Sequence, residues 1–206
     1  MRILITPFVL LWALALPAQE AADFRLHHDE DGVRVYLREE ANGDISVRVE
    51  TEAEATVAAA RRVLDEVDDY PYWVHRCSRA TVLPGGTERT FVYQSIVDLP
   101  FPFRDREVVA RIEQQTSADG RRFTRHITSV PDEIPATAGV ERMRVYEADW
   151  VVEALEKGGA AGAGSIVLRC TVRTDAGGGL PGWLRREVVT GGPAKTMVNL
   201  RDRLGS

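Results

Sequence analysis

The chain has 206 residues, of which 44% are hydrophobic and 28% are charged, and its formal net charge is −5 at pH 7. This length suits one folded domain, or at most two small ones, and it is enough to build a hydrophobic core. The composition excludes a disordered chain, a collagen-like chain and a small disulfide-rich protein. The acidic balance argues against a general nucleic-acid binder, so nucleic acid is not an expected partner.

The N-terminus has the layout of a secretory signal peptide. Arg2 supplies a positive start, and residues 3–16 form an uncharged apolar run. That run of about 14 residues is shorter than the roughly 20 that a membrane-spanning helix needs. We therefore expect a signal peptide at residues 1–18, with cleavage as late as Ala22 as the alternative. The exported domain, periplasmic or secreted, would occupy residues 23–206. An uncleaved membrane anchor is the other interpretation of this segment.

Export would place Cys77 and Cys170 in an oxidising compartment, where one disulfide between them can form. The sequence has no Cys-x-x-Cys pair and no cluster of cysteine with histidine, so neither a redox motif nor a metal site is supported. It also lacks a Gly-x-Ser-x-Gly elbow, an HExxH motif and a phosphate-binding P-loop. We therefore expect no cofactor, no metal and no catalytic residues.

Hydrophobic periodicity predicts a sheet-rich domain with two helical segments. Strand-like patterns occur at residues 33–37, 45–50, 80–83, 89–97, 106–113, 122–130, 142–155 and 166–173. Between the second and third of these, apolar residues recur at helical spacing from Val57 to Val67, after a capping Thr56. Pro71 would end or kink that helix. The aromatic cluster at residues 70–73 is interpreted as packing of the helix end onto the sheet.

A second helical segment is predicted at the C-terminus. It would begin near Pro181, which suits a first helical turn. Gly191-Gly192-Pro193 would interrupt it, before an apolar stripe resumes at Met197, Leu200 and Leu204. The interruption would serve either as a hinge or as a kink that follows the curvature of the sheet.

The strands predict one continuous antiparallel sheet with an apolar face and a charged face. Only the two helical segments are available to cover the apolar face. A curved sheet cannot close tightly onto one long helix everywhere. We therefore expect a cavity between them, lined by apolar side chains with a few polar groups, as ligand sites usually are.

An ordered set of motifs resembles the START (StAR-related lipid-transfer) domain. The set is Asp-Gly-Val-Arg-Val-Tyr at 31–36, Tyr-Pro-Tyr-Trp at 70–73, Leu-Pro-Phe-Pro-Phe at 99–103, Asp-Arg-Glu at 105–107, Leu-Pro-Gly-Trp-Leu at 180–184 and Gly-Pro-Ala-Lys-Thr-Met-Val-Asn-Leu-Arg at 192–201. The resemblance spans residues 24–204 and points to the single-domain bacterial type with a signal peptide. It implies an α+β helix-grip fold, in which a curved antiparallel β-sheet wraps around a long C-terminal helix and encloses a hydrophobic tunnel.

The chain departs from the family pattern at two places. Arg106-Glu107 stands where the family usually has Arg-Asp, so an ion pair made there must shift by one methylene. Arg185-Arg186 stands where the family commonly has an Asn. Both departures bear on polar ligand contacts rather than on the fold.

Arg106 is the most informative candidate for a ligand contact. It shares a strand face with Val108, Ala110 and Ile112, so alternation turns it inward. A buried charge is costly unless it is paired, so a carboxylate partner is expected. Arg106 would either anchor a polar group of the ligand or hold the adjacent loop to the sheet. The same two interpretations apply to Arg144.

The other predicted ligand contacts come from inward strand faces and from the C-terminal helix: Tyr146, Trp150, Leu168, Val172, Val188 and Met197. The family resemblance places the proline-stiffened loop with Phe101 and Phe103 near the tunnel mouth. Their rings would either enter a membrane surface or fold into the core. Gly191, Gly192 and Pro193 are expected to belong to the lid over the tunnel.

We therefore predict a monomeric protein that binds a hydrophobic small molecule, in particular a lipid, in an internal tunnel. It would transfer this ligand between membranes through transient membrane contact. Two alternatives stay open. Enzymes such as cyclases and hydrolases exist on the same fold, and fold alone does not decide function. A lipid-dependent sensor or adaptor with an exported protein partner is the second alternative.

Overall fold

The computed structural model describes residues 24–41, 44–155, 164–175 and 179–205. The predicted signal peptide at residues 1–18 and its alternative cleavage after Ala22 lie outside the described residues. No helix of the described part of the chain combines the length and the apolar character needed to cross a membrane.

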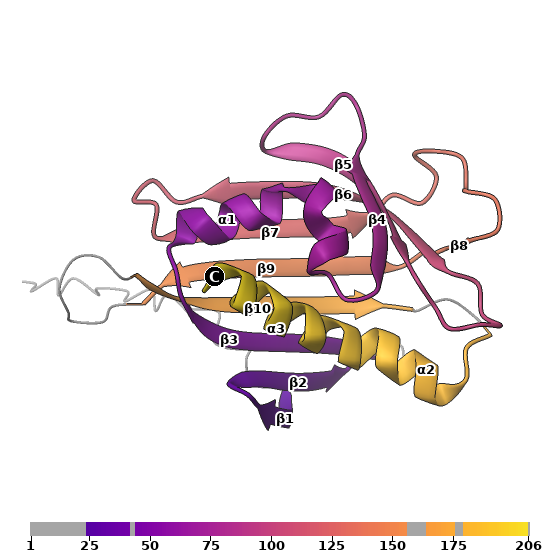
Figure 1. Cartoon of the computed structure of the whole chain (residues 1–206), viewed down its shortest axis with the longest axis horizontal. Coiled ribbons are helices and arrows are strands. Elements are labelled where there is room, and N and C mark those ends of the chain that lie inside the picture. The colour runs from indigo at the N-terminus through magenta and orange to yellow at the C-terminus, as the bar shows by residue number, and fades with distance from the viewer. Residues whose placement is uncertain (1–23, 42–43, 156–163, 176–178, 206) are drawn as a thin grey trace, which may run out of the picture.

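Ten strands of the described residues form one sheet (Figure 1). Its order is β1-β2-β3-β10-β9-β7-β6-β5-β4, with antiparallel neighbours throughout, and β8 pairs in parallel with the start of β6. The strands are β1 (Arg25–Glu30), β2 (Val33–Glu39), β3 (Ile45–Glu54), β4 (Cys77–Val82), β5 (Thr90–Val97), β6 (Arg106–Thr116), β7 (Arg122–Ser129), β8 (Glu141–Arg142), β9 (Tyr146–Ala154) and β10 (Ser165–Thr174).

Two strands differ from the sequence prediction. β1 was not predicted, because all six of its residues are exposed and it pairs only at the sheet edge, so it shows no apolar alternation. The predicted strand at 142–155 is two strands, β8 and β9, which pair with different neighbours and are separated by residues 143–145. β8 joins the edge of β6, whereas β9 lies in the centre of the sheet.

The predicted internal helix is confirmed as α1 (Val57–Asp65), followed by a 3-10 helix, η1 (Val67–Tyr72). Thr56 caps α1 by accepting a hydrogen bond from the Ala59 amide at 3.1 Å. Pro71 lies within η1, so α1 ends well before it. The Tyr70 ring makes T-shaped contacts with Trp73 and Tyr93, at centroid distances of 5.2 and 6.0 Å. The predicted aromatic packing is therefore confirmed for Tyr70 and Trp73, whereas Tyr72 is exposed.

The end of α1 is fixed to the sheet through the fully buried Arg125 of β7. Its guanidinium donates to the backbone oxygen of Leu64, to the Tyr70 hydroxyl and to the carboxylate of Asp65. Gln114 of β6 accepts further bonds from the same guanidinium. A buried charge with this many partners is well satisfied, so it gives the junction a single arrangement.

The C-terminal helix runs without interruption through α2 (Gly182–Arg186), a π-helical turn η2 (Glu187–Gly191) and α3 (Gly192–Leu204). The predicted interruption at Gly191-Gly192-Pro193 is therefore wrong. The helix instead continues through this segment as a wider π turn, in which the Gly192 amide donates to the Glu187 backbone oxygen five residues earlier. Figure 1 shows the C-terminal helix crossing the same face of the sheet that α1 covers.

The sheet has the predicted apolar and charged faces. Val47, Val49, Val152 and Leu168 are among the fully buried residues of the helix-covered face. On the other face, directly opposed charges pair across strands, with Arg169 Nε lying 2.7 Å from Glu50 and Arg173 Nη2 lying 2.7 Å from Glu147. Cys77 and Cys170 are both buried free thiols, so the disulfide that the sequence left open is not formed.

Candidate functional site

A cavity of about 140 Å³ lies between the inner face of the sheet, η1 and the C-terminal helix. The strands contribute mostly apolar walls, among them Val108, Trp150, Cys170 and Val172. Polar residues interrupt this lining, namely Arg106, Arg76, His75, Glu187, Tyr70, Tyr146, Thr174 and Thr196. An apolar enclosure with a small number of polar groups is typical of small-molecule sites.

Five of the seven predicted ligand contacts line this cavity, namely Arg106, Tyr146, Trp150, Val172 and Val188. Gly192 and Pro193, predicted for the lid, also line it.

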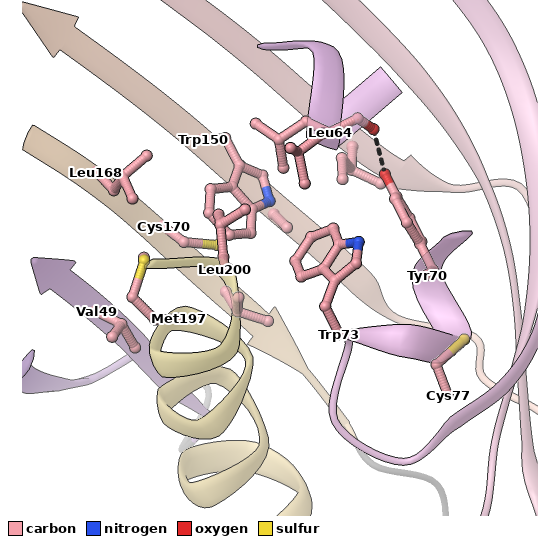
Figure 2. Packing of buried hydrophobic residues seen from close by; sticks show 14 of the residues in the cluster. Val49, Leu64, Tyr70, Trp73, Cys77, Trp150, Leu168, Cys170, Met197 and Leu200 are labelled. Carbon is pink, nitrogen blue, oxygen red and sulfur yellow. Dashed lines mark hydrogen bonds between the residues drawn. The ribbon is translucent and has the colours of Figure 1, made fainter. Parts of the chain in front are cut away.

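Leu168 and Met197 do not line the cavity, although both are fully buried. Figure 2 shows Met197 near Val49, and it shows Leu168 and Met197 on the other side of Leu200 from Trp73. Strand alternation sets the face of the sheet on which a residue lies, but not its distance from a cavity on that face.

Arg106 is buried, with 2% of its surface exposed, and it lines the cavity. Its Nη1 lies 3.1 Å from the Glu141 carboxylate and donates to the Arg104 backbone oxygen at 2.7 Å. The predicted carboxylate partner is therefore present. Because Glu141 belongs to β8, the ion pair also fastens β8 to β6, so both interpretations of Arg106 fit its position.

Glu107 points away from the cavity into a separate buried cluster. It lies 2.7 Å from Arg142 Nε and accepts hydrogen bonds from the Thr137 hydroxyl and from Gln94. Burial raises the pKa of Glu107, but the bonds from Arg142, Thr137 and Gln94 together outweigh it and lower the pKa to about 2. The longer side chain that replaces the family's Asp is thus fully accommodated.

Comparison with known proteins places the chain in a family. No family model matches it. The uncharacterized protein PA1579 of Pseudomonas aeruginosa is 30% identical to it over 183 residues, covering 88% of this chain and 87% of that protein. The chain belongs to the same family as this Pseudomonas protein.

Solved structures identify the fold. The STAR-related lipid transfer protein of Xanthomonas axonopodis is 22% identical, with a TM-score of 0.73, and the match covers 89% of this chain and 99% of that chain. Human StAR-related lipid transfer protein 5 is 16% identical, with a TM-score of 0.75, covering 90% and 88%. The chain has the START fold. The predicted α+β helix-grip architecture, a sheet around a long C-terminal helix, is therefore confirmed.

In this START fold, α3 is fastened to the segment that follows η1. The Thr196 hydroxyl accepts a hydrogen bond from the His75 amide at 3.1 Å, and Asn199 Nδ2 donates to the Trp73 backbone oxygen at 2.8 Å. The two side chains lie one turn apart, so they hold consecutive parts of one wall of the cavity. The sequence analysis included this helix in the family motif, but it did not predict that Thr196 and Asn199 fasten the helix to the segment after η1.

Glu187, in η2 at the cavity wall, contacts two basic side chains. Its carboxylate lies 2.6 Å from Lys195 Nζ and 3.4 Å from His75 Nε2. The hydrogen bond from Lys195 lowers the pKa of Glu187, and burial together with the charge of Lys195 lowers the pKa of His75. At neutral pH the cluster therefore holds an ionised carboxylate beside a neutral imidazole.

The aromatic residues predicted for the tunnel mouth differ in exposure. Phe101 is 97% exposed, whereas Phe103 is half-buried and packs against the core. Trp183, which the sequence analysis quoted only as part of a family motif, is 61% exposed in the first turn of α2. Antiparallel pairing brings the end of β5, the start of β6 and the end of β10 to one end of the sheet. Both exposed rings therefore follow strands that finish at that end.

One further expectation is contradicted by the structure. Arg144 lies between β8 and β9, is exposed and pairs with Asp132 at 2.9 Å, so its predicted inward position is wrong. Alternation fails there because Arg144 is outside any strand. Among the described residues, no group of three or more His, Cys, Asp or Glu side chains is arranged to hold a metal ion.

Proposed function

We propose that this protein binds a lipid between its sheet and its C-terminal helix and carries it between membranes. The observation that supports this most directly is the buried cavity beneath the C-terminal helix, with apolar walls and Arg106 at its edge. The solved neighbours are named as lipid transfer proteins. The export signal predicted at residues 1–18 makes the periplasm or the cell exterior the proposed place of action.

The cavity must widen to take a whole lipid. At about 140 Å³ it is smaller than the roughly 300–1,000 Å³ of typical small-molecule sites. Burying about 300 Å² of a lipid's apolar surface would contribute roughly 7 kcal/mol before ordering costs, which suits a reversible carrier. The half of the helix from α2 to η2 is the proposed moving wall, because α3 is fastened by Thr196 and Asn199.

Membrane contact is proposed for the end of the sheet that carries Phe101 and Trp183. Exposed aromatic rings partition into the interface between water and lipid. Arg185 and Arg186 are exposed beside Trp183 and would attract anionic headgroups. This position would present the moving half of the helix to the membrane.

Mass spectrometry of the protein purified from its native host under non-denaturing conditions tests the function. We expect one intact lipid per chain, and we expect the lipid-free protein to accelerate exchange of fluorescent phospholipid between vesicles. A chain that carries no lipid and leaves exchange at the spontaneous rate would count against the proposal. Chemical conversion of a bound ester or polyketide would favour the enzyme alternative instead.

A further inference from the structure

The indole Nε1 of Trp73, at the cavity wall, has no hydrogen-bond partner among the described residues. Trp73 is 3% exposed and lines the cavity, and its indole Nε1 makes no hydrogen bond to any described residue. An indole N–H can only donate. A buried donor without an acceptor is unfavourable, and such atoms are rare in folded proteins.

The backbone oxygen of Leu64, on the same wall of the cavity, already accepts two hydrogen bonds. Figure 2 shows the indole between Tyr70 and Leu200, close to Leu64, and the Leu64 oxygen accepts from the Tyr70 hydroxyl at 2.8 Å. The same oxygen also accepts from Arg125. The Tyr70 ring stands at 76° to the indole, and an aromatic ring is at best a weak acceptor, through its π face.

The position of the indole is fixed before any ligand arrives. Asn199 holds the Trp73 backbone oxygen at 2.8 Å, and Tyr70 packs edge-on against the ring. His75 Nε2, at the same wall, also lacks a partner with hydrogen-bond geometry, although it lies 3.4 Å from Glu187. A donor on a ring that is already held in place at the wall of an apolar cavity loses little entropy on binding an acceptor.

We propose that Trp73 Nε1 donates a hydrogen bond to an oxygen atom of the bound ligand. This inference rests on the proposed function and narrows it, because the ligand class becomes an amphiphile whose apolar body carries an acceptor oxygen. A hydroxyl, an ester carbonyl or a ketone meets this requirement. A plain hydrocarbon leaves the indole unsatisfied and binds more weakly.

Two small probes of matched shape test this without widening the cavity, since a cavity of about 150 Å³ accepts a benzene-sized ring. Acetophenone carries an acceptor oxygen, and ethylbenzene does not. We would titrate each into the full-length protein with ¹⁵N-labelled indoles and follow the Trp73 Nε1–H resonance. The resonance is assigned by its loss in Trp73→Phe. Trp150→Phe, which removes the same ring type from the same cavity, is the matched control.

We expect acetophenone to bind roughly three- to tenfold more tightly than ethylbenzene, which is the usual net effect of one hydrogen bond. The Trp73 N–H proton should move downfield with acetophenone only. The preference should vanish in Trp73→Phe and persist in Trp150→Phe.

Three results would overturn the inference. Equal affinity of the two probes in the wild type means that the indole is satisfied by water or by the Tyr70 ring, while the lipid-binding proposal stands. A preference for acetophenone that survives in Trp73→Phe places the donor elsewhere. Failure of both probes to bind removes this inference together with the proposed cavity, and only that outcome also counts against the proposed function.

Discussion

Arg106 and Glu107 are adjacent on β6, and both charges are buried on opposite faces of the sheet. The two residues of β8 neutralise them in register, since Glu141 pairs with Arg106 and Arg142 pairs with Glu107. A strand of two residues is too short to be stable by itself, so these ion pairs hold it to the sheet together with the backbone bonds from Glu141 to Asp105 and from Met143 to Glu107. Pairing each charge also removes the penalty of burying it.

Replacing Glu107 by Gln should lower the free energy of unfolding by about 3 kcal/mol at pH 7, because Arg142 loses its buried counter-ion. The wild type should also lose stability in acid. Since the folded pKa is about 2 and the ordinary value is 4.5, the stabilisation by Glu107 is complete above pH 4.5 and disappears as the pH falls toward 2. Urea unfolding at several pH values measures both effects.

The control for Glu107 is Glu153→Gln, which breaks an exposed pair with Arg122. That change should cost less than about 1 kcal/mol. Equal losses in the two variants, or an unchanged acid slope in Glu107→Gln, would contradict the assigned pKa.

Phe101→Asp should slow lipid exchange between vesicles several-fold while changing the unfolding free energy by less than about 0.5 kcal/mol, because the ring is almost fully exposed. Leu26→Asp on β1, at the edge of the sheet, is the control, since it also replaces an exposed apolar residue. Phe103 is unsuitable for this test because it packs against the core. Equal exchange rates in the two variants would argue against a membrane-facing loop.

At the scale of elements, the sequence predicts a helix or strand correctly where the pattern that marks it lies within that element. Period-2 alternation located the central strands, and the capping Thr56 located the start of α1. Prediction failed where an element depends on its neighbours. β1 has no buried face, and β8 is a two-residue strand whose pairing with β6 no local pattern predicts. The orphaned indole of Trp73 was equally invisible, because a missing partner is a property of the packed molecule.

Gly191 and Gly192, where η2 meets α3, allow a test of whether the C-terminal helix bends at this turn. A methyl group at Gly192 would meet only the Glu187 backbone oxygen, at 3.7 Å, which is ordinary contact. Gly192→Ala should therefore stabilise the helix by about 0.5–1 kcal/mol. If the π turn is where the helix bends, the stiffer turn should also slow release of a fluorescent lipid. Thermal unfolding and stopped-flow release measure the two effects.

Gly191→Ala is the matched comparison. Its methyl group would lie 2.5 Å from the Glu187 carboxylate and displace that side chain from Lys195. We expect a smaller gain in stability and release at least as fast as in the wild type. Stabilisation by Gly192→Ala with unchanged release would show that the helix does not bend at this turn.

At the scale of the whole molecule, the sheet presents more apolar surface than α1 and the C-terminal helix cover. The uncovered apolar surface lies in one part of the inner face. Near Leu168 and Met197 the packing is complete, and the free space gathers where Trp150 and Val172 face η1. Composition and alternation predicted that a cavity exists. They did not predict its position, because that depends on how the helix axis crosses a twisted sheet.

Two substitutions on β10 distinguish the cavity from the packed core. Phe in place of Val172 extends a ring into the free space, so the chain should stay folded within about 1 kcal/mol while its lipid content falls at least tenfold. Phe in place of Leu168 has no free space to enter and should destabilise the fold by about 1–3 kcal/mol while the folded fraction keeps its lipid. Chemical denaturation and lipid extraction from the purified variants give both quantities. If Val172→Phe retained its lipid, the ligand would have to bind elsewhere on the molecule, and the position of the site would need to be abandoned even though the fold stands.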